Sequence, residues 1–208
     1  MKKPLKIISV DGTRGTGKTS QIKMLAKYLK SLGLTCSTLD SGDNIQSMSI
    51  AIKFTESFLD NPFNPNGVVI LDGSIARPMV QELIGGVSTP KVMDKYKNVI
   101  HDYERLDQKH GMVGLLLVMD DIDELNNRIT KHRELSGKDS NDVVDLSRES
   151  DIVNGMRTFN NHVVSKNIKF HTINIEPVNS IIEINKAMID YLKENYDIPV
   201  SIKDDNDW

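Results

Sequence analysis

Apolar positions follow two alternating patterns along the chain. Continuous apolar runs with the length of buried strands occur at residues 5–10, 34–39, 68–71, 113–119 and 168–175. Between these runs, apolar residues recur three and four positions apart, which is the spacing of one face of an α-helix. Apolar strands that alternate with helices are typical of a parallel sheet with both faces covered. The pattern therefore predicts an α/β fold with a five-stranded parallel sheet and right-handed crossovers.

Start and stop signals support the first and last of these helices. The first is expected from about Lys18 to Gly33, with one apolar face formed by Ile22, Leu25, Ala26, Leu29 and Leu32. Its opposite face is basic, and glycine is a common helix stop. Ser180 and Glu183 have the spacing of a capping box, which predicts the start of a final helix that continues to Leu192.

A long helix is expected from Thr89 to Gly111, with Thr89 as N-cap and Pro90 as the first helical residue. Its apolar stripe consists of Val92, Tyr96, Val99, Tyr103 and Leu106. Further helices are predicted around residues 122–129 and 152–163, where apolar side chains keep the same period.

Two segments lack such a pattern. Residues 131–145, KHRELSGKDSNDVVD, are polar and contain Gly, Ser and Asn, so we predict a mobile lid loop there. Residues 197–208 are mostly acidic and are expected to fray. At 208 residues and 38% hydrophobic content, the chain is long enough for one core. We therefore predict a single domain over residues 1–196.

Charge and cysteine content narrow the class of protein. The formal net charge is -3, and both signs are spread along the chain, which argues against a nucleic-acid or membrane-surface binder. Cys36 is the one cysteine, so no internal disulfide can form. No apolar stretch approaches the ~20 residues of a membrane span. We expect a cytoplasmic protein without nucleic-acid or membrane partners.

The stretch VDGTRGTGKTSQ, residues 10–21, lies between the first strand and the first helix. It contains the complete motif G-x-x-x-x-G-K-[ST] in the strand–loop–helix context that the motif requires. Backbone N–H groups of such a loop and the following helix N-terminus bind phosphate. Lys18 is expected on the β and γ phosphates of ATP, and the Thr19 hydroxyl on Mg²⁺. The predicted cofactor-binding residues are Gly12, Thr13, Arg14, Gly15, Thr16, Gly17, Lys18, Thr19 and Ser20.

The run VVILD ends in Asp72. Ligands of open α/β sheets lie outside the carboxyl ends of the strands, so Asp72 can lie beside the glycine-rich loop if the two strands are neighbours. There it could hold Mg²⁺ or accept a proton from an attacking hydroxyl. The alternative is a structural aspartate that caps the turn before Pro78.

Cations gather at the predicted lid, which carries Arg128, Lys131, His132, Arg133 and Lys138. Phosphoryl transfer depends on positioning and charge neutralisation, which a closing basic loop supplies while it excludes water. The sequence therefore predicts at least one catalytic arginine here. The alternative is a solvated basic face paired with Glu124, Glu134 and Asp139.

Three segments together resemble thymidylate kinases and the wider nucleoside and nucleotide kinase group. They are DGTRGTGKTS after a strand, LDGSIARP at a strand end, and LLLVMDDIDELNNRITKHREL. The resemblance covers most of residues 5–194. It implies that Lys18 and the loop backbone bind the ATP phosphates, that Arg128 and Arg133 contact the transferring phosphate, and that Asp72 lies near Mg²⁺ and the acceptor. It also implies a homodimer as an option, for which the stripe of the long helix could serve unless it is core.

The chain departs from that family where the acceptor phosphate would bind. Gly73 and Ser74 replace an Arg-Tyr pair, and Asp40-Ser41-Gly42 replaces an Arg-Glu-Pro-Gly stretch. Arg14 stands where many thymidylate kinases have a carboxylate. Arg14 or Arg77 could take over the phosphate contact, because a planar guanidinium suits it.

These observations predict ATP- and Mg²⁺-dependent phosphoryl transfer to a deoxynucleoside monophosphate, with thymidylate as the first guess. The predicted catalytic residues are Lys18, Asp72, Arg128 and Arg133, and the predicted acceptor-binding residues are Arg14, Asp72, Arg77 and Gln81. The base is expected near Gln81, Phe54, Phe58, Tyr96 and Tyr103, although such aromatics are more often core. The alternatives are a deoxynucleoside kinase and an ATP-binding protein without catalysis.

Overall fold

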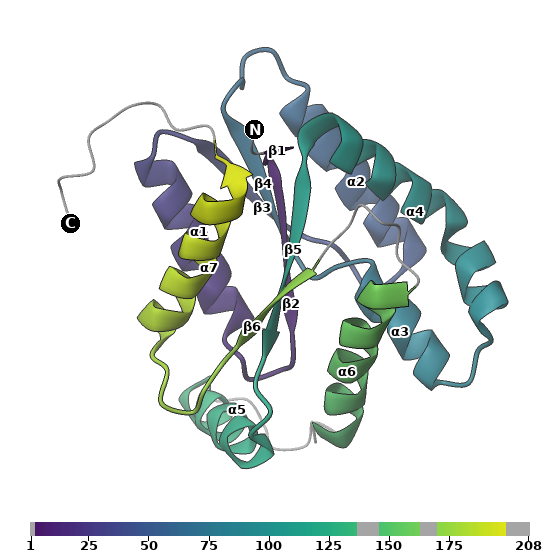
Figure 1. Ribbon diagram of the computed structural model, residues 1–208, viewed down its shortest axis with the longest axis vertical. Helices are drawn as coiled ribbons and strands as arrows, with labels where there is room; N and C mark the ends of the chain where they lie inside the picture. The colour runs from purple at the N-terminus through teal and green to yellow at the C-terminus, as the bar shows by residue number, and fades with distance from the viewer. Residues whose placement is uncertain (1–2, 137–145, 163–169, 199–208) are drawn as a thin grey trace.

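A five-stranded parallel sheet lies at the centre of the computed structural model, which describes residues 3–136, 146–162 and 170–198 (Figure 1). The strand order is β3-β4-β2-β5-β6, and the five strands confirm the predicted α/β fold. The strands are β2 Ile7–Gly12, β3 Thr35–Asp40, β4 Gly67–Asp72, β5 Met112–Val118 and β6 Phe170–Asn174. All neighbouring pairs are parallel, so the carboxyl ends of the strands meet at one edge.

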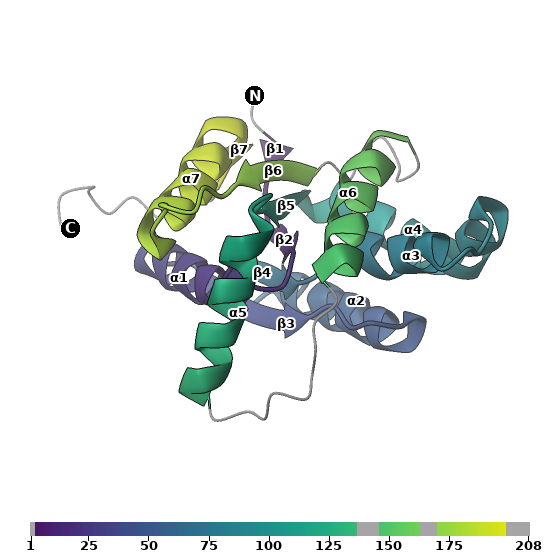
Figure 2. The same cartoon turned by 90° about the horizontal axis from the view of Figure 1, so that it is seen from below.

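Helices cover both faces of the sheet and enclose two apolar cores (Figures 1 and 2). The helices of one face are α1 Lys18–Ser31 and α7 Ile181–Asn195. Those of the other are α2 Ile45–Leu59, α3 Ala76–Ile84, α4 Thr89–His110 and α6 Leu146–His162. Helix α5 Ile122–Ser136 lies across the carboxyl edge of the sheet. Among the described helices, none is both long and apolar enough to cross a bilayer.

The strand order positions Asp72 beside the glycine-rich loop. Strand β4 is hydrogen-bonded to β2, although α1, β3 and α2 separate them along the chain, and Val10 pairs with Asp72. On its other side, Asp72 is in register with Asp40 of the edge strand β3. The strand of Asp72 is therefore a neighbour of the strand before the glycine-rich loop, which is the condition for Asp72 to lie beside the loop.

The long helix contributes its apolar stripe to the core. Tyr96 and Tyr103 are 2% and 1% exposed, so they are core residues and do not form a stacking surface for a base. Thr89 is the first residue of α4 and Ser88 is its N-cap, one position earlier than predicted. Such shifts are common, because a helix end depends on local hydrogen bonds and not on the apolar period.

The predicted lid loop is partly helical. Residues 131–136 continue α5, because KHRELS consists mostly of good helix formers, and residues 137–145 lie outside the described part. The fold also extends past residue 196. Two short strands pair in parallel, β1 Lys3–Pro4 and β7 Tyr196–Asp197, and Ile198 is buried. The tail expected to fray lies outside the described residues from 199 onward.

Candidate functional site

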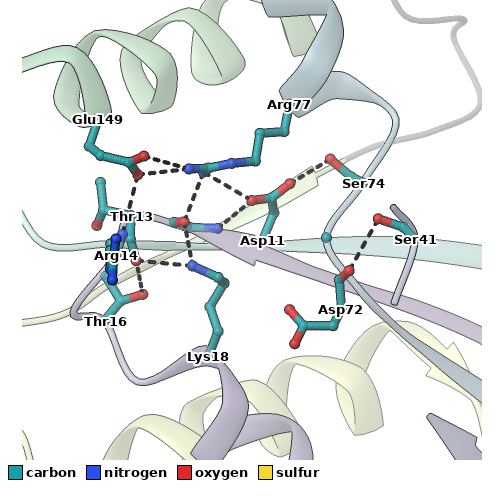
Figure 3. Close-up of polar contacts among 12 residues, drawn as sticks. Asp11, Thr13, Arg14, Thr16, Lys18, Ser41, Asp72, Ser74, Arg77 and Glu149 are labelled. Atoms are coloured by element: carbon teal, nitrogen blue, oxygen red, sulfur yellow. Dashed lines mark hydrogen bonds and ion pairs between the residues drawn. The ribbon is translucent and has the colours of Figure 1, made fainter. Parts of the chain in front are cut away.

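The glycine-rich loop connects β2 to α1 and encloses the side chain of Lys18 (Figure 3). Gly12 has φ +152°, and a Cβ there would lie 2.3 Å from the carbonyl oxygen of Leu117, so only glycine fits. The Lys18 ammonium donates to the carbonyl oxygens of Gly12 at 2.8 Å and Thr13 at 3.2 Å. Gly17 caps α1 with φ +82° and without a side chain, which leaves the N-terminus of α1 open to an anion.

The hydroxyl groups of the loop and of the first turn of α1 differ in their surroundings. Thr16 is buried and donates from Oγ1 to the carbonyl oxygen of Thr13 at 2.7 Å, which closes the loop on itself. Thr19 and Ser20, in the first turn of α1, are exposed. Thr19 lines the same groove as Asp72, so the hydroxyl predicted to bind Mg²⁺ and the predicted carboxylate face one space.

Asp72 is half-buried at the end of β4. Its backbone carbonyl accepts hydrogen bonds from Ser41 N at 3.0 Å and Ser41 Oγ at 3.1 Å, which fixes the end of β3 beside it. Burial raises the pKa of the Asp72 carboxyl, and the nearby Asp40 and Asp11 raise it further, although the Lys18 ammonium acts in the opposite direction. The site therefore contains a carboxylate that holds a proton more readily than usual.

Asp11 is a site residue that the sequence reasoning missed. It is fully buried, and its two oxygens accept from Gly12 N and from Ser74 Oγ, each at 2.8 Å. Arg77 lies 3.6 Å from it. A signal was available, because Asp11 is the one charged residue of an apolar strand and directly precedes the glycine-rich loop. A buried charge requires partners, and here they come from the loop, the end of β4 and α3.

Arg77 connects α3 to the loop and to α6. Its Nη2 lies 2.8 Å and 2.7 Å from the two carboxylate oxygens of Glu149, and its Nη1 donates to the carbonyl oxygen of Gly12 at 3.2 Å. Glu149 also accepts a hydrogen bond from the backbone N of Arg14 at 3.4 Å. Although burial lowers the pKa of Arg77, Asp11, Glu149 and Asp43 raise it more, so it remains charged.

A cleft of about 350 Å³ opens beside these residues, and we call it the main cleft. The ionisable residues that line it are Asp11, Asp40, Asp43, Asp72, Glu149, Arg14, Lys18 and Arg77. A second groove, of about 540 Å³, runs between α1 and β3 and shares Asp40 and Asp72 with the main cleft. The phosphate-binding loop therefore faces a cavity whose wall carries more carboxylates than cations.

The structure separates the predicted acceptor residues. Arg14, Asp72 and Arg77 line the main cleft, whereas Gln81 is absent from the described lining of both cavities. Phe54 is 46% exposed on α2, and its ring centroid lies 6.2 Å from that of Phe58. The expectation that the base binds near these side chains is therefore not supported by the position of Gln81.

Of the two predicted lid arginines, the structure describes the side chain of Arg128 but not that of Arg133. Arg128 donates from Nε to Glu124 at 2.6 Å and from Nη2 to the carbonyl oxygen of Pro177 at 3.0 Å. This arrangement agrees with the alternative of a basic face paired along its own helix. Arg133 lies in α5, but its side chain and the whole of Lys138 lie outside the description. Their catalytic roles stay predictions.

The donor set at the strand ends fits Mg²⁺. In the described part of the chain, no group of three or more His, Cys, Asp or Glu residues could hold a metal ion by itself. Mg²⁺ in phosphoryl-transfer sites usually takes one or two protein oxygens and completes its shell with phosphate and water. Thr19 and Asp72 supply that number from one groove.

Comparison with known proteins supports the fold alone. No family model matches the chain, and no curated protein matches it. Among solved structures, the crystal structure of polyphosphate kinase 2 from Arthrobacter aurescens TC1 superposes with a TM-score of 0.59. The match covers 100% of this chain and 74% of that one at 14% sequence identity. The chain therefore has the α/β fold of a P-loop kinase, while likeness to thymidylate kinases in particular stays a prediction.

Proposed function

We propose that the protein transfers the γ-phosphoryl group of ATP, bound with Mg²⁺, to a small nucleoside or nucleotide acceptor in the main cleft. One observation carries this proposal. The strand order brings Asp72 next to Lys18 and Thr19, so phosphate-binding, metal-binding and proton-accepting groups face adjoining cavities. A loop that only bound phosphate would not need the carboxylate.

Each group has a role in this reaction. The loop N–H groups and the α1 N-terminus bind the β and γ phosphates, and Lys18 neutralises their charge. Thr19 and Asp72 would hold Mg²⁺, which when bound offsets charge on the transferring phosphate. Arg128 and Arg133 are the proposed lid cations, and Arg14, Arg77 and Gln81 stay proposed acceptor contacts. The solved neighbour is named a kinase, which supports the reaction class but, at 14% identity, not the acceptor.

Two acceptors remain within this proposal. The resemblance to thymidylate kinases favours a deoxynucleoside monophosphate, thymidylate first. A free deoxynucleoside is the second candidate, and one observation favours it: Arg77, a partly buried arginine of the main cleft, is already paired with Glu149 and Asp11.

The test is phosphate transfer from Mg-ATP to a panel of nucleosides and their monophosphates, with products separated by chromatography. We expect transfer to at least one acceptor and no transfer without Mg²⁺. We expect kcat to fall by a factor on the order of 10³ or more in Lys18→Ala, because that variant lacks the ammonium group that neutralises the transferring phosphate. The fold of the variant is checked by circular dichroism. ATP binding without any transfer would contradict the proposal and favour a non-catalytic ATP-binding protein.

A further inference from the structure

The positive charge of Arg77 is already neutralised within the main cleft. The side chains of Arg77 and Glu149 are 19% and 18% exposed, and both carboxylate oxygens of Glu149 accept from Nη2 of the guanidinium. Asp11, which is 0% exposed, faces the other guanidinium nitrogen and is itself held by Gly12 and Ser74. A phosphate on the acceptor would have to displace Glu149 and would still meet the fixed charge of Asp11.

The backbone at Gly73 explains why no arginine stands there, where thymidylate kinases have one. Gly73 has φ +95°, and a Cβ there would lie 2.7 Å from the Oγ of Ser41, which is itself buried. Ser41 is held there by two hydrogen bonds to the carbonyl of Asp72. An arginine at position 73 would therefore have to adopt a strained left-handed backbone and displace the Ser41 hydroxyl from its hydrogen bond to Asp72.

The remaining cation of the cleft interior has another role. Lys18 lies across the glycine-rich loop and donates to two loop carbonyls, where the phosphates of the donor bind. Arg14 lies at the exposed mouth, and its backbone N is directed to Glu149. Among the described residues that line the main cleft, neither the position of Lys18 nor the pairing of Arg77 leaves an interior cation for a second phosphate.

Carboxylates instead face the space where the acceptor would bind. Asp72 and Asp40 lie side by side at the ends of β4 and β3, and Asp40 Oδ1 accepts from Gly42 N at 2.8 Å, which fixes the turn toward Asp43. Asp43 lines the cleft from that turn and lies near enough to Arg77 to interact with its charge. Carboxylates accept hydrogen bonds from hydroxyl and amino groups but repel phosphate.

We infer that the acceptor is an uncharged hydroxyl compound of the nucleoside class, recognised through hydrogen bonds to Asp40 and Asp43, and that Arg77 is a positioning residue and not a phosphate receptor. This inference rests on the proposed function and selects between its two acceptors. In the reaction, the acceptor hydroxyl oxygen forms a bond to the γ-phosphorus, the bond from that phosphorus to the bridging oxygen breaks, and ADP leaves with the electron pair. The hydroxyl proton passes to the carboxylate oxygen of Asp72 that does not hold Mg²⁺.

The experiment measures binding and turnover with matched acceptors. The four deoxynucleosides and their 5′-monophosphates are titrated by calorimetry in the presence of Mg²⁺ and a non-hydrolysable ATP analogue, and the same eight compounds are then tested as acceptors with Mg-ATP. We expect at least one deoxynucleoside to bind about tenfold or more tightly than its monophosphate, because the added dianion faces an excess of carboxylates. We expect that nucleoside to be converted to a monophosphate.

The outcomes separate the two levels of the proposal. Tighter binding and turnover of a monophosphate would overturn the inference and leave the proposed function intact. Binding of the ATP analogue without binding of any of the eight compounds would overturn the inference as well. Failure of the ATP analogue to bind would overturn the proposed function itself.

Two variants test the assigned residues. Asp43→Asn should raise KM for the nucleoside about tenfold and change kcat less, since a hydrogen-bond acceptor for substrate is weakened. Asp94→Asn, an exposed change on α4, is the matched control. Glu149→Gln removes the charge that occupies Arg77, so monophosphate binding should tighten by several-fold relative to nucleoside binding. An unchanged preference in Glu149→Gln would overturn the role of Arg77.

Discussion

At the scale of single residues, the cleft combines charges that a stable core would avoid. Asp11 is fully buried yet satisfied by the loop, by Ser74 and by Arg77. Asp72 lies in the same region, where burial raises the pKa of its carboxyl more than the Lys18 ammonium lowers it. Carboxylates placed this way reduce stability, so their presence at a phosphate-binding loop is more consistent with chemistry than with packing.

Asp72→Asn should abolish transfer and stabilise the fold at neutral pH. The pKa of Asp72 is higher in the folded protein than in the unfolded chain, so ionisation costs stability at pH 7, and the cost disappears below the unfolded pKa. We expect Tm to rise by about 1–3 °C at pH 7 and to stay unchanged near pH 3. Thermal unfolding at both pH values measures this, with Asp94→Asn as control. A lower Tm at pH 7 would contradict the assigned cause of the shift.

At the scale of elements, the helices on either side of the predicted lid, α5 and α6, both contact the glycine-rich loop. Leu125 and Ile129 of α5 are buried, and a Cβ on Gly15 would lie 3.2 Å from both of their side chains, so α5 packs directly on the glycine-rich loop. Glu149, in the first turn of α6, accepts hydrogen bonds from Arg77 and from the backbone N of Arg14. Both helices next to the lid therefore contact the phosphate-binding loop.

Arg133→Ala and Arg128→Ala should differ in their kinetics. If Arg133 neutralises the transferring phosphate, its loss lowers kcat by a factor on the order of 10² to 10³ with less effect on ATP affinity. Arg128 is paired with Glu124 and Pro177, so its loss should lower kcat less than about tenfold. Steady-state kinetics with varied ATP measures both. Equal losses would show that Arg128 leaves Glu124 during catalysis, as the family resemblance implies.

At the scale of the whole molecule, two apolar cores flank one sheet, and polar contacts fix how the helices cover it. The apolar stripe of α4 is buried in one core, so it is not available as a dimer face, and the homodimer stays a prediction. On the other face, Asn185 of α7 donates from Nδ2 to the backbone and side-chain oxygens of Gln21 at 3.1 Å and 3.0 Å. This contact fixes α1, whose N-terminus forms part of the site.

Asn185→Ala should destabilise the whole fold. Asn185 is 4% exposed, and its loss leaves the buried side-chain oxygen of Gln21 unsatisfied, at a cost of about 1–3 kcal/mol. For a domain of this size we expect Tm to fall by roughly 2–10 °C. Thermal unfolding is the measurement, and Asn195→Ala, at an exposed position of the same helix, is the control. Equal effects of both changes would show that the buried network is not the cause.

The sequence by itself determined the five strands of the main sheet, most helices and the glycine-rich loop, because these depend on apolar period and on a motif within twelve residues. The role of Asp72 stays a prediction. Helix α3 was not predicted, although its apolar residues Ala76, Met79, Val80, Leu83 and Ile84 keep a helical period. Only the tertiary structure decided that Arg77 pairs with Glu149, 72 positions away, and that Asp11 bonds Ser74, 63 positions away. Such contacts leave no local pattern, because they depend on which strands and helices become neighbours.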